Sequence, residues 1–200
     1  ELYRAHAEVP ALMPFLHLPV QSGSDKILKA MNRKHTRDDY FRAIDKMREA
    51  RPDIAFSSDF IIGFPGETDE DVEMTLDLIE RVKFASAYSF NYSQRPGTPA
   101  AALQQQVHPS LMDLRLHRLQ KLVMTQTGAF NDTFVGRQIP ILFEKTGHKP
   151  GQIMGRSPWM QSTYTAIPDH QQERFIVQTR IVKITGASAT ALKAELAVIE

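Results

Sequence analysis

The sequence contains no cysteine in its 200 residues. That absence excludes a disulfide framework, and it excludes any iron-sulfur or zinc site that takes thiolate ligands from this chain. Seven histidines occur, but they fall at no spacing typical of a zinc site. Hydrophobic runs of membrane-spanning length are also missing, which predicts no membrane partner. The formal net charge is only +1, so no global electrostatic attraction draws the chain to nucleic acid.

The apolar content is sufficient for two domains. Hydrophobic residues make up 42% of the 200 positions, which can build one medium domain and one small one. We expect the boundary near residue 135, where the sequence pattern changes. The first domain then covers residues 1–134 and the second covers residues 135–200.

The first hundred residues alternate apolar segments with amphipathic helices. Segments 15–20, 54–63 and 86–92 are predicted strands, and a polar loop follows each of them. The predicted helices open at three good N-capping residues, Ser24, Thr36 and Thr68. Strands that alternate with helices predict right-handed βαβ crossovers and a parallel α/β sheet, in which the loops after the strands share one rim. Ligand sites in such sheets lie on that rim.

Side-chain alternation predicts which face of the sheet is polar. Successive strand residues point to opposite faces, and the apolar side must meet the helices, so Tyr88, Phe90 and Tyr92 are expected to face them. The concave face then carries six polar residues: His17, Gln21, Ser57, Asp59, Ser89 and Asn91. A closed (β/α) barrel fills its interior with Val, Ile and Leu. A polar concave face therefore predicts an open or partial parallel (β/α) barrel that holds a polar ligand.

Asp59 has two interpretations on that face. A buried carboxylate without a partner would cost on the order of several kcal/mol, so Asp59 requires a ligand hydroxyl or a cation such as Arg95. The simpler interpretation is that Asp59 and Gln21 only fix the adjacent loops through capping hydrogen bonds. Polar positions at matching depth on three strands favour a ligand site.

The pattern changes to short strands after a long helix that opens at Pro109 and Ser110. Five strands are predicted over residues 139–144, 152–156, 160–166, 175–184 and 191–198. Five short strands in such a segment predict a small OB-like all-β barrel, whose exposed face commonly receives oligonucleotides.

Cationic and aromatic residues of this second domain are nominated for RNA contact, because cations meet phosphates and a ring can stack on an unpaired base. The nominated residues are Lys145, His148, Lys149, Arg156, Trp159, Arg180 and Lys183. Charge alone supports them weakly, since residues 131–200 hold eight Lys and Arg against six Asp and Glu. Trp159 fits the core of a small barrel as well as it fits a stacking role.

Four long segments resemble one enzyme family. They are His17-Leu-Pro-Val-Gln-Ser-Gly-Ser24, Ser57-Ser-Asp-Phe-Ile-Ile-Gly-Phe-Pro-Gly-Glu-Thr68, Tyr88-Ser-Phe-Asn-Tyr-Ser93 and Arg95-Pro-Gly-Thr-Pro-Ala-Ala101. These segments are similar to the radical-SAM methylthiotransferases, and residues 18–24 point to the branch that acts on isopentenylated adenosine beside the tRNA anticodon. Such motifs are far more specific than a lone glycine pattern. The resemblance covers the whole chain and is strongest up to about residue 101.

The resemblance implies a cytoplasmic enzyme of three parts. These are an amino-terminal domain with an auxiliary cluster, a radical-SAM domain whose Cys-x-x-x-Cys-x-x-Cys motif holds a second cluster, and a small TRAM domain that binds tRNA. The implied cofactors are S-adenosyl-L-methionine and two 4Fe-4S clusters, and the implied partners are tRNA and an electron donor. Family chemistry removes hydrogen from carbon 2 of the adenine and installs sulfur and a methyl group.

The missing cysteines bear on what this chain can do alone. Both clusters need thiolate ligands, and the chain begins at Glu1 and supplies none. We therefore expect the carboxyl-terminal portion of a longer protein, namely the second half of a radical-SAM domain followed by TRAM. We expect this portion to be catalytically inert by itself.

The family's binding residues carry over to the strand ends. The resemblance implies that Gly63 and Gly66 let the backbone approach adenine or ribose, and that hydroxyl and carboxylate groups bind the ribose. The cofactor-binding candidates are Gln21, Ser22, Ser57, Ser58, Asp59, Gly63, Gly66 and Asn91. Arg95 is the candidate for the substrate or a carboxylate, because its guanidinium offers a fixed fork of donors. Glu67 is left between a site role and the dipole of helix 68–82, and no catalytic residue or metal ligand is nominated.

Two rival functions stay open. One is the same chemistry on threonylcarbamoyl-adenosine in tRNA or on an aspartate of a ribosomal protein. The other is a non-catalytic RNA-binding module, in which side chains would plug the concave face.

Overall fold

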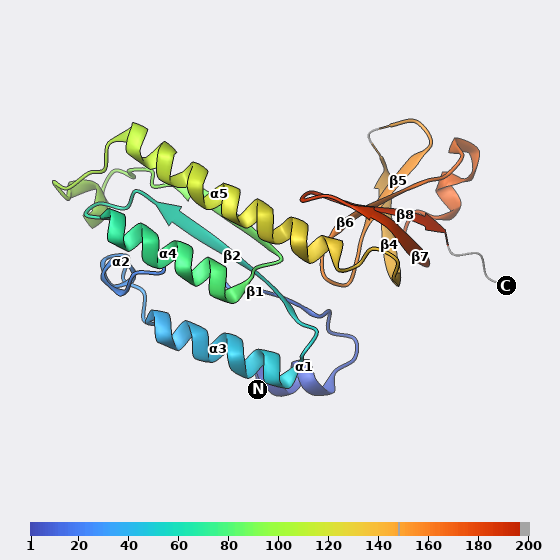
Figure 1. Cartoon of the computed structure of the whole chain (residues 1–200), viewed down its shortest axis with the longest axis horizontal. Helices are drawn as coiled ribbons and strands as arrows, with labels where there is room; N and C mark the ends of the chain where they lie inside the picture. The colour runs from blue at the N-terminus through green and yellow to red at the C-terminus, as the bar shows by residue number, and fades with distance from the viewer. Residues whose placement is uncertain (148, 197–200) are drawn as a thin grey trace. The chain divides into compact units, whose positions relative to one another are not determined.

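The chain folds into two compact units. One holds residues 1–12 and 16–124, and the other holds residues 13–15 and the chain from Thr125 onward. The computed structural model describes residues 1–147 and 149–196, which Figure 1 traces from α1 to β8. Residues 148 and 197–200 lie outside the described residues, so the nominated His148 and the end of predicted strand 191–198 have no structural outcome.

A parallel sheet of three strands forms the centre of the first unit. The strands lie in the order β1 (Phe15–His17), β2 (Ala55–Ile62) and β3 (Ser86–Asn91). β1 is shorter than the predicted strand 15–20, because Pro19 has no N–H to donate to a neighbouring strand. Pairing resumes at Gln21, which forms a parallel bridge with Phe60 of β2. The parallel sheet confirms the prediction from alternating strands and helices.

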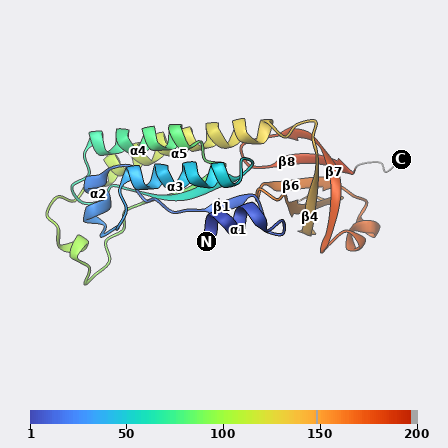
Figure 2. The same cartoon turned by 90° about the horizontal axis from the view of Figure 1, so that it is seen from below.

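Three long helices cover one face of this sheet, as Figures 1 and 2 show. They are α3 (Arg37–Ala50), α4 (Asp69–Val82) and α5 (Pro109–Asp132). Their buried side chains pack against one side of β2, and this core includes Phe56, Phe60, Ile62, Ile44, Met47, Leu78, Ile79 and Leu119. Burial contributes roughly 1.5–3 kcal/mol for each large side chain, so it fixes the helices to this one face. None of the described helices is both long enough and apolar enough to cross a membrane.

The helix starts are those that the sequence predicts. Thr36 and Thr68 each accept a hydrogen bond from the backbone three residues on, and Asp39 and Asp71 bond back to the caps. Ser24 caps α2 (Asp25–Ala30) by accepting from a backbone N–H of its first turn. Each cap is worth about 1 kcal/mol. The short elements α1 (Leu2–Glu8) and η1 (Pro99–Ala102) complete the unit.

A closed five-stranded barrel makes up most of the second unit. Its elements are β4 (Gln138–Thr146), β5 (Gln152–Arg156), β6 (Ser162–Ala166), η2 (Asp169–Arg174), β7 (Gln178–Ala187) and β8 (Leu192–Leu196). The barrel closes in the order β4-β5-β6-β8-β7, with β6 and β8 parallel and the other pairs antiparallel. Alternate residues point inward and form a separate core that includes Ile139, Ile141, Phe143 and Val182. The predicted small all-β barrel is confirmed.

Candidate functional site

The face of the sheet opposite the helices carries a cluster of His17, Ser57 and Asp59. Nδ1 of His17 lies 2.7 Å from Oγ of Ser57, and its Nε2 lies 3.5 Å from Oδ2 of Asp59. β1 supplies the histidine and alternate positions of β2 supply the other two, so all three share one face. Ser57 is buried, whereas the side chains of His17 and Asp59 are 41% and 29% exposed. The cluster therefore offers polar groups to a ligand while its own bonds hold its geometry.

Asp59 has an internal partner, His17, that differs from the predicted ones. The expected partner was a ligand hydroxyl or Arg95, but the carboxylate lies against the His17 ring. The alternative, in which Gln21 and Asp59 fix the adjacent loop, holds for their main-chain groups. The Gln21 N–H donates to the Asp59 carbonyl, and the Ile61 N–H donates to the Gln21 carbonyl, both over 2.9 Å. Gln21 has a φ of 76°, a strained value of the kind that clusters at functional sites.

β3 presents aromatic rings on this open face, contrary to the prediction. The parallel register pairs Asp59 with Tyr88 and Ile61 with Phe90, so these rings share the face of Asp59. Tyr88 is 62% exposed and Phe90 is 55% exposed. The ring of Tyr88 meets the ring of His17 edge-on, with centroids 6.4 Å apart. The prediction assigned the faces by hydrophobicity, whereas the register with β2 decides them.

Ser89 and Asn91 consequently lie on the helix side of β3, and their predicted place on the concave face is wrong. The amide Nδ2 of Asn91 donates to Oδ1 of Asp113 in α5 over 2.7 Å. Asn91 therefore ties the end of β3 to α5.

Two nominated serines brace the backbone of the segment after β1. Ser58 is fully buried, and its Oγ donates to the Leu18 carbonyl over 2.9 Å and accepts from the Val20 N–H over 3.0 Å. Ser22 is buried too, and its Oγ lies 3.4 Å from Oγ1 of Thr75 in α4. Both hydroxyls therefore hold this segment against β2 and α4.

The two nominated glycines lie against α5 and the chain that precedes it. A Cβ atom on Gly63 would come within 2.2 Å of the Met112 side chain, so Met112 fills the space that was expected for a ligand. Gly66 donates its N–H to the Gln105 carbonyl over 2.8 Å. Both glycines have positive φ, 78° and 82°, a conformation that explains why glycine stands there.

Glu67 is buried in an ion pair, a role that differs from both of those left open by the sequence. Its Oε2 accepts from Nη1 of Arg115 over 3.2 Å and from the Gly63 N–H over 2.8 Å. Arg115 also donates from Nη2 to Asp69 over 2.7 Å. Burial disfavours the charged carboxylate, outweighs the Gly63 amide and the Arg115 guanidinium, and raises the pKa of Glu67 to about 7. Glu67 therefore fastens the loop after β2 to α5.

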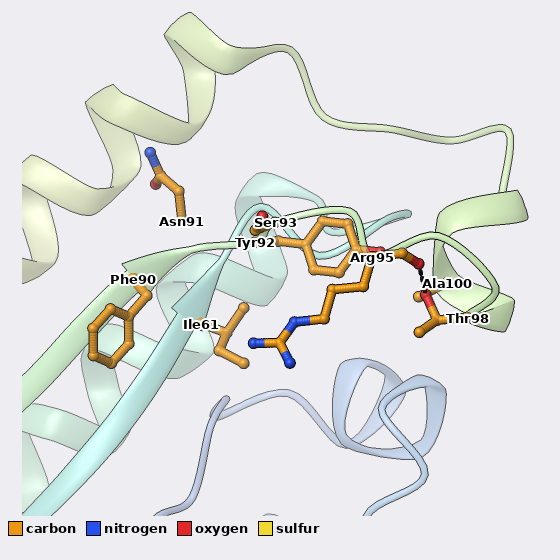
Figure 3. Close-up of a pocket in the computed structure, with 8 residues that line it drawn as sticks. All are labelled: Ile61, Phe90, Asn91, Tyr92, Ser93, Arg95, Thr98 and Ala100. Atoms are coloured by element: carbon orange, nitrogen blue, oxygen red, sulfur yellow. Dashed lines mark hydrogen bonds between the residues drawn. The ribbon is translucent and has the colours of Figure 1, made fainter.

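A hollow of about 500 Å³ lies beyond the end of β3, and Arg95 reaches into it (Figure 3). Its lining residues are Ile61, Phe90, Asn91, Tyr92, Ser93, Arg95, Thr98 and Ala100. The Thr98 Oγ1 donates to the Arg95 carbonyl over 2.8 Å, which fixes the turn that carries the arginine. Within the part of the chain that the structure describes, the Arg95 guanidinium has no ion pair.

The second unit exposes most of the residues nominated for RNA contact. Lys145, Lys149, Arg156, Arg180 and Lys183 are all exposed. Two of these have neighbours, since Arg156 lies 3.8 Å from Glu144 and Arg180 lies over the Phe175 ring. Trp159 packs on the barrel core, with its ring centroid 4.8 Å from that of Phe134. Of the two roles considered for Trp159, the structure supports the core.

A groove of about 440 Å³ on the outside of the barrel was missed in the sequence. Lys149, Gln152, Tyr164, Lys193 and Glu195 are among its lining residues. The strand register places Tyr164 between Met154 of β5 and Lys193 of β8. The alternation of β6 predicts that Tyr164 points outward, but no local signal predicts the pairing of β6 with β8.

Comparison with known proteins identifies the family. Residues 1–79 match the model of the radical SAM superfamily. Over 195 residues the chain is 53% identical to the tRNA-2-methylthio-N(6)-dimethylallyladenosine synthase of Maricaulis maris (strain MCS10). Residues 1–79 are therefore similar to the radical SAM superfamily, and nearly the whole chain is similar to one tRNA-modifying relative. The match covers 98% of the chain and 42% of the relative, so the chain spans about two fifths of that protein's length. The resemblance inferred from the motifs is confirmed.

The radical SAM superfamily, whose model residues 1–79 match, implies S-adenosylmethionine and 4Fe-4S cluster chemistry. The chain has no cysteine, so its residues do not fit a cluster that thiolates must hold. The described residues also contain no group of three or more His, Cys, Asp or Glu that could hold a metal ion. The open face does fit the adenosyl part of S-adenosylmethionine, because the partly exposed carboxylate of Asp59 can accept hydrogen bonds from hydroxyl groups beside exposed aromatic rings.

Proposed function

We propose that this chain works as part of a radical-SAM tRNA methylthiotransferase that modifies carbon 2 of N6-isopentenyladenosine beside the anticodon. The observation that carries the proposal is the 53% identity, over 98% of the chain, to a protein named for that product. The cysteines for two 4Fe-4S clusters then come from the remaining length of the enzyme, and an electron donor in the cytoplasm reduces them. The chain alone is inactive, because it has no thiolate.

The open face of the sheet is assigned to the adenosyl part of the cofactor. When bound, S-adenosylmethionine supplies the radical chemistry and the methyl group. The Asp59 carboxylate accepts hydrogen bonds from ribose hydroxyls, and His17 fixes the orientation of that carboxylate from 3.5 Å. Ser57 holds the histidine in turn, over 2.7 Å. The chain's own side chains complete this network, so little side-chain ordering opposes binding. The sheet is then one part of a (β/α) barrel that the rest of the enzyme extends.

The five-stranded barrel is assigned to RNA binding as a TRAM-like domain. Barrels of this kind bind oligonucleotides on their outer face. Lys149 and Lys193 line the groove together with Tyr164, which supports contact with phosphates and a base. Among the described residues that line this groove, Glu195 is the single acidic one, and it lies opposite Lys183 on β7. The tRNA partner follows from this assignment and from the name of the relative.

The substrate is tested by mass spectrometry of tRNA nucleosides from a strain that lacks the gene. The expected result is loss of methylthio-isopentenyladenosine and accumulation of isopentenyladenosine, with recovery when the intact gene is restored. Loss of the methylthiolated threonylcarbamoyl nucleoside, or of a methylthiolated ribosomal-protein aspartate, would instead assign one of the rival substrates. Unchanged nucleosides and ribosomal proteins would favour a non-catalytic RNA-binding module.

The cofactor assignment is tested by calorimetric titration of the cluster-loaded enzyme with S-adenosylmethionine. Asp59→Asn should weaken binding about tenfold or more, since it removes a charged acceptor worth roughly 1.5–3 kcal/mol, and should leave the cluster absorbance unchanged. Asp38→Asn, an exposed residue of α3, is the matched control. Equal affinity for all three proteins would overturn the assignment of Asp59.

A further inference from the structure

The hollow beyond β3 presents an unpaired cation on a concave surface. None of its eight lining residues is acidic, and Arg95 is its only charged member. The Arg95 guanidinium has no ion pair among the described residues, and Figure 3 shows it directed beneath the strand ends, beside Ile61. A guanidinium offers a planar fork of donors that matches two oxygens of a phosphate or carboxylate. Such a group in a cavity without an acidic neighbour is suited to an anion that comes from outside the fold.

The hollow also presents an aromatic surface that the fold does not use. Phe90 lines it and is 55% exposed, and Tyr88, two residues earlier on the same face, is 62% exposed. Adjacent exposed rings of this size mark a binding surface. Tyr92 differs from them, because its ring packs edge-on against Phe64 with centroids 5.2 Å apart. Phe90 is therefore the lining ring that is free to stack on a planar ligand.

The size of the hollow, its cationic Arg95 and its aromatic Phe90 together indicate the class of ligand that it fits. About 500 Å³ lies within the range typical of small-molecule sites. A base stacked on an aromatic ring gains about 1–3 kcal/mol, and a phosphate gains charge-assisted hydrogen bonds from an arginine. A nucleotide carries both a planar base and a phosphate, which matches Phe90 and Arg95 together.

We propose that this hollow holds one nucleotide of the RNA substrate, with its base against Phe90 and its phosphate on Arg95. The proposal rests on the proposed function and deepens it, because it assigns a substrate subsite on the sheet, separate from the barrel. The Thr98 hydroxyl, bonded to the Arg95 carbonyl, positions the arginine. The same guanidinium chemistry fits the carboxylate of S-adenosylmethionine, which also carries an adenine. The test must therefore separate these two sources of anion.

The test titrates the isotope-labelled 200-residue chain with adenosine 5′-monophosphate, adenosine and S-adenosylmethionine, and follows amide shifts by NMR. We expect the monophosphate to shift amides around residues 90–98 and to bind more tightly than adenosine. Arg95→Gln should weaken binding of the monophosphate about tenfold and leave the affinity for adenosine unchanged. Phe90→Leu should weaken both ligands by roughly fivefold or more, since it removes the stacking surface. Arg33→Gln, which removes the same charge from an exposed site, is the matched control.

Three results would overturn the inference. One is equal affinity for the monophosphate and adenosine, and another is an Arg95→Gln variant that binds the monophosphate as well as the parent chain does. The third is an Arg95→Gln variant that loses only S-adenosylmethionine, which would assign the hollow to the cofactor carboxylate. Binding of an anticodon stem-loop by the same chain separates these failures from failure of the proposed function. If the stem-loop binds through the barrel while Arg95→Gln has no effect, only the inference on the hollow is lost.

Discussion

Arg115 of α5 and Glu67 of the loop after β2 form an ion pair over 3.2 Å, with side chains only 5% and 1% exposed. The same guanidinium donates to the Glu67 carbonyl and to the Asp69 carboxylate. Glu67 in turn accepts the N–H of Gly63, the residue that follows β2. One buried arginine therefore connects the end of the central strand, the start of α4 and the second turn of α5.

Replacing Arg115 by methionine should destabilise the fold by about 3–5 kcal/mol, because it leaves a buried carboxylate without its cation. The measurement is urea unfolding followed by circular dichroism. Arg118→Met is the control on the same helix, since Arg118 pairs with Glu73 on the surface and its loss should cost less than about 1 kcal/mol. Equal losses for the two variants would show that the Arg115 pair contributes no more than a surface pair.

Glu67 should make the fold less stable as the pH rises. Its pKa is raised from 4.5 to about 7, so between these values the folded state binds more protons than the unfolded state. Stability then falls as pH increases through this window, by up to roughly 3 kcal/mol. Glu67→Gln should remove that slope, which urea unfolding at pH 5 and pH 8 would reveal. Parallel pH profiles for the two proteins would contradict the assignment.

Asp71, in the capping box of α4, should contribute more to the free energy of unfolding than Asp39, its counterpart in α3. Burial opposes its ionisation, but hydrogen bonds from Lys26, Ser24 and Thr68 outweigh that effect and hold the pKa of Asp71 at about 2. Its contribution is therefore present above about pH 4 and is lost as the pH falls toward 2.

Substitution of Asp71 tests whether its bonds to Ser24 and Lys26 stabilise the fold beyond its local role as a helix cap. Asp71→Asn should cost about 2–4 kcal/mol at pH 7, because it disturbs the cap and two long-range bonds. Asp39→Asn should cost less, since the Asp39 side chain bonds only within its own exposed helix start. Thermal unfolding at pH 7 compares the two variants, and an equal cost would exclude a special role for the Ser24 and Lys26 bonds.

Replacing each of two glycines by alanine should change the stability of the fold in opposite directions. A Cβ on Gly23 would lie 2.4 Å from the Met74 carbonyl oxygen, a backbone atom of α4 that cannot move aside. Gly23→Ala should therefore destabilise the chain by about 1–3 kcal/mol or more. Gly128 lies inside α5 with its nearest neighbour at 3.9 Å, so Gly128→Ala should stabilise by up to about 1 kcal/mol. Thermal unfolding measures the stability of both variants. A Gly23→Ala variant as stable as the parent chain would refute the close approach of Gly23 to the Met74 backbone.

RNA binding by the barrel should depend on Tyr164 and Lys193 more than on Trp159. Tyr164→Leu should weaken binding of a single-stranded oligonucleotide about fivefold or more, through lost stacking. Lys193→Gln should weaken binding and reduce its salt dependence by about one phosphate contact. Lys29→Gln, which removes the same charge from an exposed site on α2, is the control. Lys183→Gln, exposed on β7 and outside the groove, tests the rival surface. Fluorescence anisotropy at several salt concentrations measures these effects, and a larger loss from Lys183→Gln would move the RNA surface to β7.

Local sequence chemistry was sufficient for the elements and their starts. Thr36 with Asp39 and Thr68 with Asp71 form the predicted capping boxes, and the apolar periods place α3, α4 and α5. Those signals work because a cap or an amphipathic period involves residues within a turn or two of one another. The family motifs added the likeness to the methylthiotransferases, which the identity to a relative confirms.

The partners of the candidate site were decided by the tertiary structure. Hydrophobicity alone put Tyr88 and Phe90 toward the helices, while pairing with β2 turns them to the open face. The bond between His17 and Ser57 joins residues 40 positions apart, and the bond between Glu67 and Arg115 joins residues 48 positions apart. Sequence by itself determined which segments become strands and helices, because those preferences are local. Register and long-range side-chain pairing determined what each polar residue touches, because they depend on how distant segments pack.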